Sequence, residues 1–219
     1  IHKPGDSSVL ITQTREDTVS SHILEIGYEW YGSCAQGSGL NAEVTRKIKG
    51  DIVKTIIPNQ IITKDPQVEN SGSNTALVYL KVEVPQEDIT ALDENNNKGT
   101  KQTQDLFTLK DVSSQWELIR TETLKDQTTG KSKTSYVYAY KKPLESGKTT
   151  DKLFQQVQVK NFIEKDIESN VEDIIITAGA IQSTNVSGID LTPQGDGTIP
   201  KEKLDKVYDI FLNQSGDKI

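Results

Sequence analysis

A chain of 219 residues has the length of one domain, and a hydrophobic content of 33% is low but sufficient for the core of a β-sandwich. The formal net charge of -7 argues against nucleic acid and anionic membrane surfaces as partners, and no apolar run approaches the length of a membrane span. The sequence lacks methionine even at position 1, so we interpret it as the product of a longer precursor that lost a signal peptide, and we expect a secreted protein.

The N-terminal quarter combines polar stretches with short apolar runs. Residues 1–22 are polar apart from Val9, Leu10 and Ile11, and they predict an extended segment that contains one short strand. We treat this segment as separate from a domain that spans residues 23–219. The elements predicted in this quarter are strands over residues 8–14, 23–31 and 52–57 and a glycine-rich loop over residues 32–39.

The clearest local pattern lies between Pro58 and Pro85. An extended segment over residues 61–69 contains a proline, which confines it to a strand start or a sheet edge. A turn rich in Asn, Ser and Gly follows over residues 70–74, and we expect Pro85 to end the strand after it. In that strand, residues 76–84, apolar side chains at Leu80, Val82 and Val84 alternate with Lys81 and Glu83. The pattern predicts either a β-hairpin or two strands that cross between sheets.

The middle of the chain alternates polar stretches with strand-forming ones. Residues 86–104 are mostly polar and predict a long surface loop. Strands are predicted over residues 115–120 and 135–141, with a polar loop between them. The second of these places Tyr136, Tyr138 and Tyr140 on one face, which we interpret as core or cross-strand packing rather than as a ligand platform.

The C-terminal part contains a strand-forming run over residues 174–178 and one helix. Residues 200–214 place apolar side chains at helical spacing, and Pro200 is suited to the helix start. The apolar positions are Leu204, Val207, Tyr208, Phe211 and Leu212. Taken with the many short strands, this predicts an all-β fold, a jelly-roll-like β-sandwich with long loops and a C-terminal amphipathic helix.

No group of residues meets the requirements of a catalytic or metal site. His2 and His22 lie in the polar N-terminal region without a third zinc ligand. Residues 93–99 imitate a calcium loop, but the glycine falls one position late and Gln104 stands where a bidentate Glu is required. Cys34 has no base beside it in the sequence. We therefore predict no enzyme, no metal and no cofactor; a Lys–Asn isopeptide link stays open, because it requires a buried carboxylate beside the pair.

Three short blocks resemble a known family. The first is Lys64, Asp65, Pro66, Val68, Asn70 and Gly72 followed by the strand over residues 76–84. The second lies within residues 135–157 and includes Leu144, Gly147, Thr150, Leu153, Phe154 and Val157; the third is IIITAGAIQS at residues 174–183. Together they are similar to the TasA/camelysin family of exported Gram-positive proteins, which a dedicated signal peptidase releases. Camelysin is described as a metalloprotease, but this chain lacks a zinc signature and we do not transfer that activity.

The resemblance implies a secreted structural subunit of an extracellular or cell-surface fibre or biofilm matrix. Its expected partners are further copies of itself and other matrix or cell-wall proteins. We predict that Val9, Leu10 and Ile11 form the assembly element, by adding as a strand to an open sheet edge. A flexible tether left from the precursor is the alternative interpretation of the same residues. The competing function is that of a cell-surface adhesin or pilin-like binding domain of a Gram-positive bacterium.

Overall fold

The computed structural model describes residues 9–13, 22–26, 57–167, 171–184, 186 and 188–215. In this part the chain forms strands, one short 3-10 turn and one α-helix. They are β1 (Val9–Gln13), β2 (His22–Ile26), β3 (Ile61–Thr63), β4 (Gln67–Asn70), β5 (Ala76–Leu92), β6 (Lys98–Asp105), β7 (Phe107–Lys110), β8 (Trp116–Lys125), β9 (Ser132–Tyr140), β10 (Gln156–Val159), η1 (Glu164–Asp166), β11 (Ile175–Gln182) and α1 (Lys201–Ser215). The loop predicted over residues 32–39, Cys34 and most of the strand predicted over residues 52–57 lie outside the described residues.

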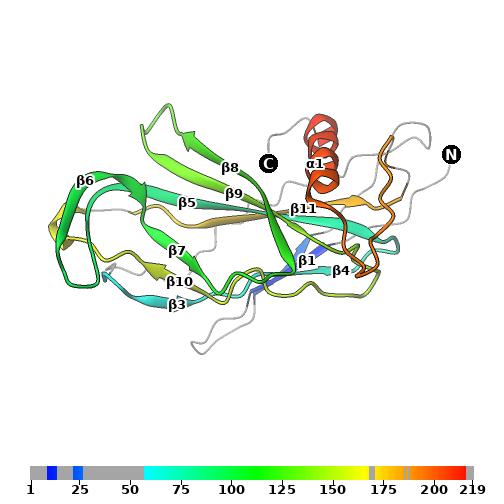
Figure 1. The fold of residues 1–219 in the computed structure, drawn as a ribbon, viewed down its shortest axis with the longest axis horizontal. Coiled ribbons are helices and arrows are strands. Elements are labelled where there is room, and N and C mark those ends of the chain that lie inside the picture. Colours follow the sequence, from blue (N-terminus) through cyan, green and yellow to red (C-terminus); the bar gives the residue numbers. More distant parts are fainter. Residues whose placement is uncertain are drawn as a thin grey trace.

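The strands form three antiparallel sheets, which face one another in two layers. The largest has the order β11-β5-β9-β8, with β6 paired to the far end of β5. Two smaller sheets, β3-β10-β7 and β2-β1-β4, lie on one side of it, and α1 lies on the other (Figure 1). The predicted fold class, an all-β sandwich with one C-terminal helix, is therefore confirmed, and the helix has nearly the predicted bounds.

The strand β5 forms because its apolar residues recur at every second position. Leu80, Val82 and Val84 are completely buried between the layers, as the alternation predicts. On the opposite face, Lys81 and Glu83 form an ion pair of 2.7 Å. Because β3, β4 and β5 belong to three different sheets, the predicted crossing between sheets is correct and the alternative hairpin is wrong.

Pro85 does not end β5, contrary to the prediction. The backbone N–H and C=O of one residue in an antiparallel strand point to the same side, and the Pro85 carbonyl accepts a hydrogen bond from the Leu106 amide at 2.9 Å. On that side β11 pairs up to Glu83, and β6 begins to pair at Gln86. The proline therefore occupies the junction between two neighbouring strands, where its missing N–H leaves no ladder position empty.

The long loop predicted over residues 86–104 is wrong, because these residues form the hairpin of β5 and β6. The turn is built on Asp93, whose carboxylate accepts the amides of Asn95 and Asn97 at 2.8 Å. Asn96 adopts a left-handed conformation with φ of 60°, which Asn tolerates better than most residues. The residues that imitate a calcium loop thus form the tight turn between β5 and β6.

The helix α1 packs its apolar side against the outer face of the large sheet. Tyr79 of β5 donates its hydroxyl proton to the Leu204 carbonyl at 3.0 Å, and its ring centre lies 5.1 Å from that of Tyr208. Arg120 of β8 adds ion pairs to Asp205 at 2.7 Å and to Asp209 at 2.6 Å. Leu204, Val207, Tyr208 and Phe211 are buried, as the helical spacing predicts.

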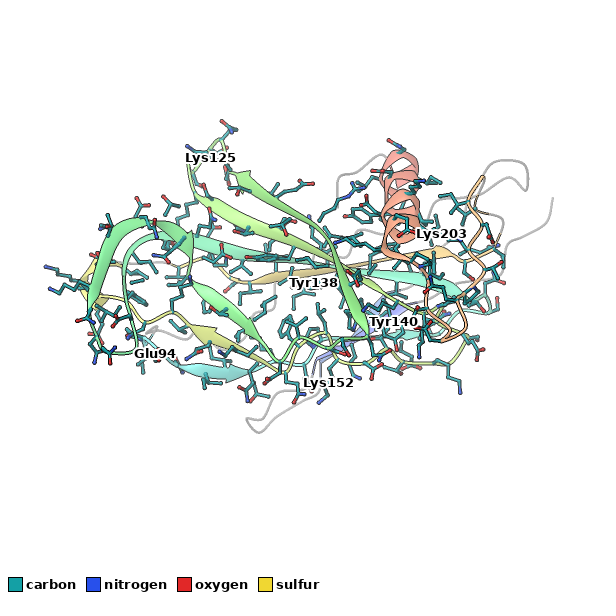
Figure 2. The ribbon with its side chains drawn as sticks, viewed as in Figure 1. Glu94, Lys125, Tyr138, Tyr140, Lys152 and Lys203 are labelled. Atoms are coloured by element: carbon teal, nitrogen blue, oxygen red, sulfur yellow. The ribbon has the colours of Figure 1, made fainter. Side chains whose placement is uncertain are left out.

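The three tyrosines of β9 pack in the core, as predicted. Tyr138 and Tyr140 are buried and Tyr136 is half-buried; Figure 2 shows the first two along β9. The hydroxyl of Tyr136 donates to Asp105, and that of Tyr140 donates to Asp151 at 2.7 Å. Both hydroxyls are used inside the domain, which supports packing over ligand binding.

Two buried tyrosines, Tyr140 of β9 and Tyr208 of α1, predict a loss of stability in alkali. Burial, with a smaller contribution from the Asp151 hydrogen bond, raises the pKa of Tyr140 to about 12, and burial raises the pKa of Tyr208 to about 12. In an unfolded chain a tyrosine ionises near pH 10. Between these values the unfolded state binds fewer protons than the folded state, so the free energy of unfolding falls as pH rises. The stabilisation that comes from keeping these phenols protonated is fully present below about pH 10.

Urea unfolding at pH 8, 10 and 11 measures this effect, and the midpoint should decrease between the last two values. Tyr208→Phe is the matched variant, since it removes one of the raised groups and should make the decrease smaller. Equal midpoints at pH 8 and pH 11 would contradict the assignment of these phenols to the core.

Candidate assembly site

The strand predicted for assembly, which contains Val9, Leu10 and Ile11, lies on the edge of β4. It forms β1, and the register sets Val9 opposite Asn70, Leu10 opposite Glu69, Ile11 opposite Val68 and Thr12 opposite Gln67. Its other edge pairs with β2, from Val9 opposite Ile26 to Gln13 opposite His22. Figure 1 shows β1 beside β4. The predicted boundary between residues 22 and 23 falls within β2.

The opposite edge of β4 is held by residues 147–153, here called the backing segment. The Asn70 amide donates to the Lys148 carbonyl at 2.9 Å, and the Gly147 amide donates to the Asn70 carbonyl at 2.7 Å. The Val68 amide donates to the Thr150 hydroxyl at 3.0 Å, and the Thr150 amide donates to the Val68 carbonyl at 2.8 Å. The backing segment therefore fixes β4 independently of β1.

These bonds determine which backbone groups of β4 face β1. Successive residues of a strand direct their N–H and C=O groups to opposite edges. Since Val68 and Asn70 direct theirs to the backing segment, Gln67 and Glu69 direct theirs to β1. Leu10 opposite Glu69 and Thr12 opposite Gln67 are then the hydrogen-bonded pairs of this interface, whereas Ile11 opposite Val68 is a non-hydrogen-bonded pair.

Asn70 is the best-anchored side chain of the site. It is completely buried. Its amide group donates to the carbonyls of Asn74 and Leu144, both at 2.8 Å, and its Oδ1 accepts the Gly72 amide at 3.1 Å. A buried amide with all of these partners ties the end of β4 to the following turn and to the strand-like segment around Leu144.

The other residues of the first resemblance block also turn toward the domain. Asp65 is 4% exposed and pairs with Lys152 of the backing segment at 2.7 Å, and Lys152 is labelled in Figure 2. The Pro66 carbonyl accepts the Leu153 amide at 2.9 Å. Val68 is completely buried. The residues of this block therefore contact the core and the backing segment, and the other edge of β4 pairs with β1.

The structure brings the three resemblance blocks together. The first supplies β4, the second supplies the backing segment, and the third forms β11, which pairs with β5 from Ile175 opposite Glu83 to Gln182 opposite Ala76. The sequence shows these blocks only as separate short motifs. The hydrogen-bonding role of residues 147–153 was not predicted, although the motif that contains Gly147 and Thr150 was the signal for it.

Within the described residues, no three His, Cys, Asp or Glu side chains are placed to hold a metal ion. His22 lies in β2, and His2 and Cys34 fall outside the described residues. Asp190 and Asp196 accept the amides of Thr192 and Thr198, each at 3.0 Å. Asp190 also forms an ion pair of 3.5 Å with Lys203 of α1, so these carboxylates cap surface turns and, at Asp190, contact the helix.

The chain was also compared with known proteins. No family model, no curated protein and no solved structure matches it. In the described part of the chain, no helix has the length and hydropathy needed to span a membrane.

Proposed function

We propose that this protein is a structural subunit of an extracellular or cell-surface fibre, which assembles when the N-terminal strand of one copy takes the place of β1 on β4 of the next. The observation that carries the proposal is the position of β1. It is the first described strand of the chain, and its register with β4 covers four residue pairs. Main-chain hydrogen bonds supply the affinity of such a strand addition.

The exchange replaces one set of contacts with an identical set. A copy of β1 from a neighbour meets the same Gln67 and Glu69 backbone groups and the same register on β4, so little free energy separates the closed and exchanged forms. An empty β4 edge would expose unpaired backbone groups, which favours occupation by one strand or another. Donor and acceptor are different surfaces, so the contact is head-to-tail and extends into a filament when it does not close into a ring.

The resemblance to the TasA/camelysin family supports this proposal, because its first two blocks form β4 and the backing segment. We accordingly propose an exported, non-enzymatic protein of a Gram-positive cell surface or biofilm matrix, with itself as the first partner and other matrix or cell-wall proteins as further ones. A monomeric adhesin is the competing function.

The test compares the full chain with a variant that begins at Gly27, both at high concentration near neutral pH. Electron microscopy should show filaments only for the full chain, while a cooperative melting curve shows that the shorter one is folded. Filaments from both, or a full chain that stays monomeric and binds a glycan or protein ligand, would contradict the proposal.

A synthetic peptide of residues 1–20 should bind the variant that begins at Gly27. N-methylation of Leu10 removes an N–H that faces β4 and should abolish binding. N-methylation of Ile11, whose N–H faces away from β4, is the matched control and should leave binding intact. Equal effects of the two modifications would contradict the register seen between β1 and β4.

A further inference from the structure

The strand β2 is joined to the described part of the domain through β1. Five residue pairs connect the two strands, from Val9 opposite Ile26 to Gln13 opposite His22. The sheet order is β2-β1-β4. Among the described residues, β1 is the one strand that pairs with β2. Any movement of β1 away from β4 must therefore either break the pairing with β2 or carry β2 along.

The backbone of β1 uses its two edges for different partners. Leu10 and Thr12 direct their N–H and C=O groups to β4, so Val9, Ile11 and Gln13 direct theirs to β2. Withdrawal of β1 alone breaks both sets of hydrogen bonds and leaves β2 without its partner. Among the ladder hydrogen bonds of the described residues, withdrawal of the two strands together breaks only the set to β4, which the neighbour's strand then replaces.

We propose that the exchanging unit is the hairpin of β1 and β2, residues 9–26, rather than β1 alone. The inference rests on the proposed assembly through β1 and specifies what moves. In the fibre, the neighbouring copy then supplies β1 to the β4 edge, with β2 paired to the other edge of β1. The partner that occupies the β4 edge is a second copy of this chain.

Two engineered disulfides separate this inference from the proposed function. Non-hydrogen-bonded pairs of an antiparallel ladder have Cα atoms about 4.5 Å apart, within the range that a disulfide bridges. In a Cys34→Ser background, Thr12→Cys with Ile23→Cys joins β1 to β2, because these residues form such a pair. In the same background, Ile11→Cys with Val68→Cys joins β1 to its own β4.

Both double variants are oxidised as dilute monomers, concentrated and examined for filaments by electron microscopy, with and without dithiothreitol. The Thr12–Ile23 disulfide should leave filament formation intact, since the hairpin still moves as a unit. If it abolishes filaments until the disulfide is reduced, β1 exchanges alone and the inference is wrong.

The Ile11–Val68 disulfide should abolish filaments, and reduction should restore them. This variant tests the proposed function separately, because it blocks exchange whether or not β2 moves. Filaments from its fully oxidised form would overturn assembly through β1. Restoration by reduction shows that the chain with both new cysteines folds, so the loss of filaments arises from the disulfide.

Discussion

Val82→Asp should lower the free energy of unfolding by on the order of 4 kcal/mol. Val82 is completely buried, and it lies in β5 opposite Ile176 on one side and Tyr136 on the other. A carboxylate at this position either loses its hydration without a partner or takes up a proton, and both cost free energy. Urea unfolding at neutral pH measures the change.

Thr121→Asp is the matched control, because it places the same side chain on an exposed position of β8. Its effect should stay within about 0.5 kcal/mol, as is usual for surface substitutions. A Val82→Asp midpoint equal to that of the control would show that β5 does not carry the core of the sandwich.

Asn70→Ala should cost about 2 to 3 kcal/mol, because it leaves the carbonyls of Asn74 and Leu144 and the amide of Gly72 without their side-chain partners in a buried site. The variant should also assemble poorly, since β4 loses the anchor at its end. Melting temperature and filament yield are the two readouts.

Asn95→Ala serves as the control for Asn70→Ala, since Asn95 is exposed in the turn between β5 and β6. It should change neither readout. A stable Asn70→Ala protein that forms filaments normally would show that the Asn70 side chain does not anchor β4.

The elements predicted correctly from the sequence are those in which burial produces a regular pattern. The alternation around Val82 and the helical spacing of Leu204 and Phe211 each record one buried face. The hairpin of β5 and β6 has no such apolar pattern in the sequence, because residues 98–103 are all exposed. Pro85 misled the prediction because its position between β11 and β6 depends on tertiary pairing.

The strand pairing at the candidate assembly site was predicted only in part for the same reason. A short apolar run at Val9, Leu10 and Ile11 indicates a strand, but its partner β4 begins more than fifty residues later in the sequence. Backbone groups of Gln67 and Glu69 make that pairing, and backbone groups leave no trace in the choice of amino acid. Two side chains do mark the site in the sequence. Thr150 fastens β4 to the backing segment, and Asn70 ties the end of β4 to the following turn and to Leu144.

The most direct measurement of the central claim is cross-linking between chains in the filament. Ile11→Cys and Val68→Cys are introduced into separate chains, each with Cys34→Ser, and the two proteins are mixed, assembled and then oxidised. Because these positions form a non-hydrogen-bonded pair of β1 and β4, a non-reducing gel should show disulfide-linked pairs that contain one chain of each variant. Filaments that yield no such mixed pairs after oxidation would show that β1 of one copy does not lie on β4 of the next.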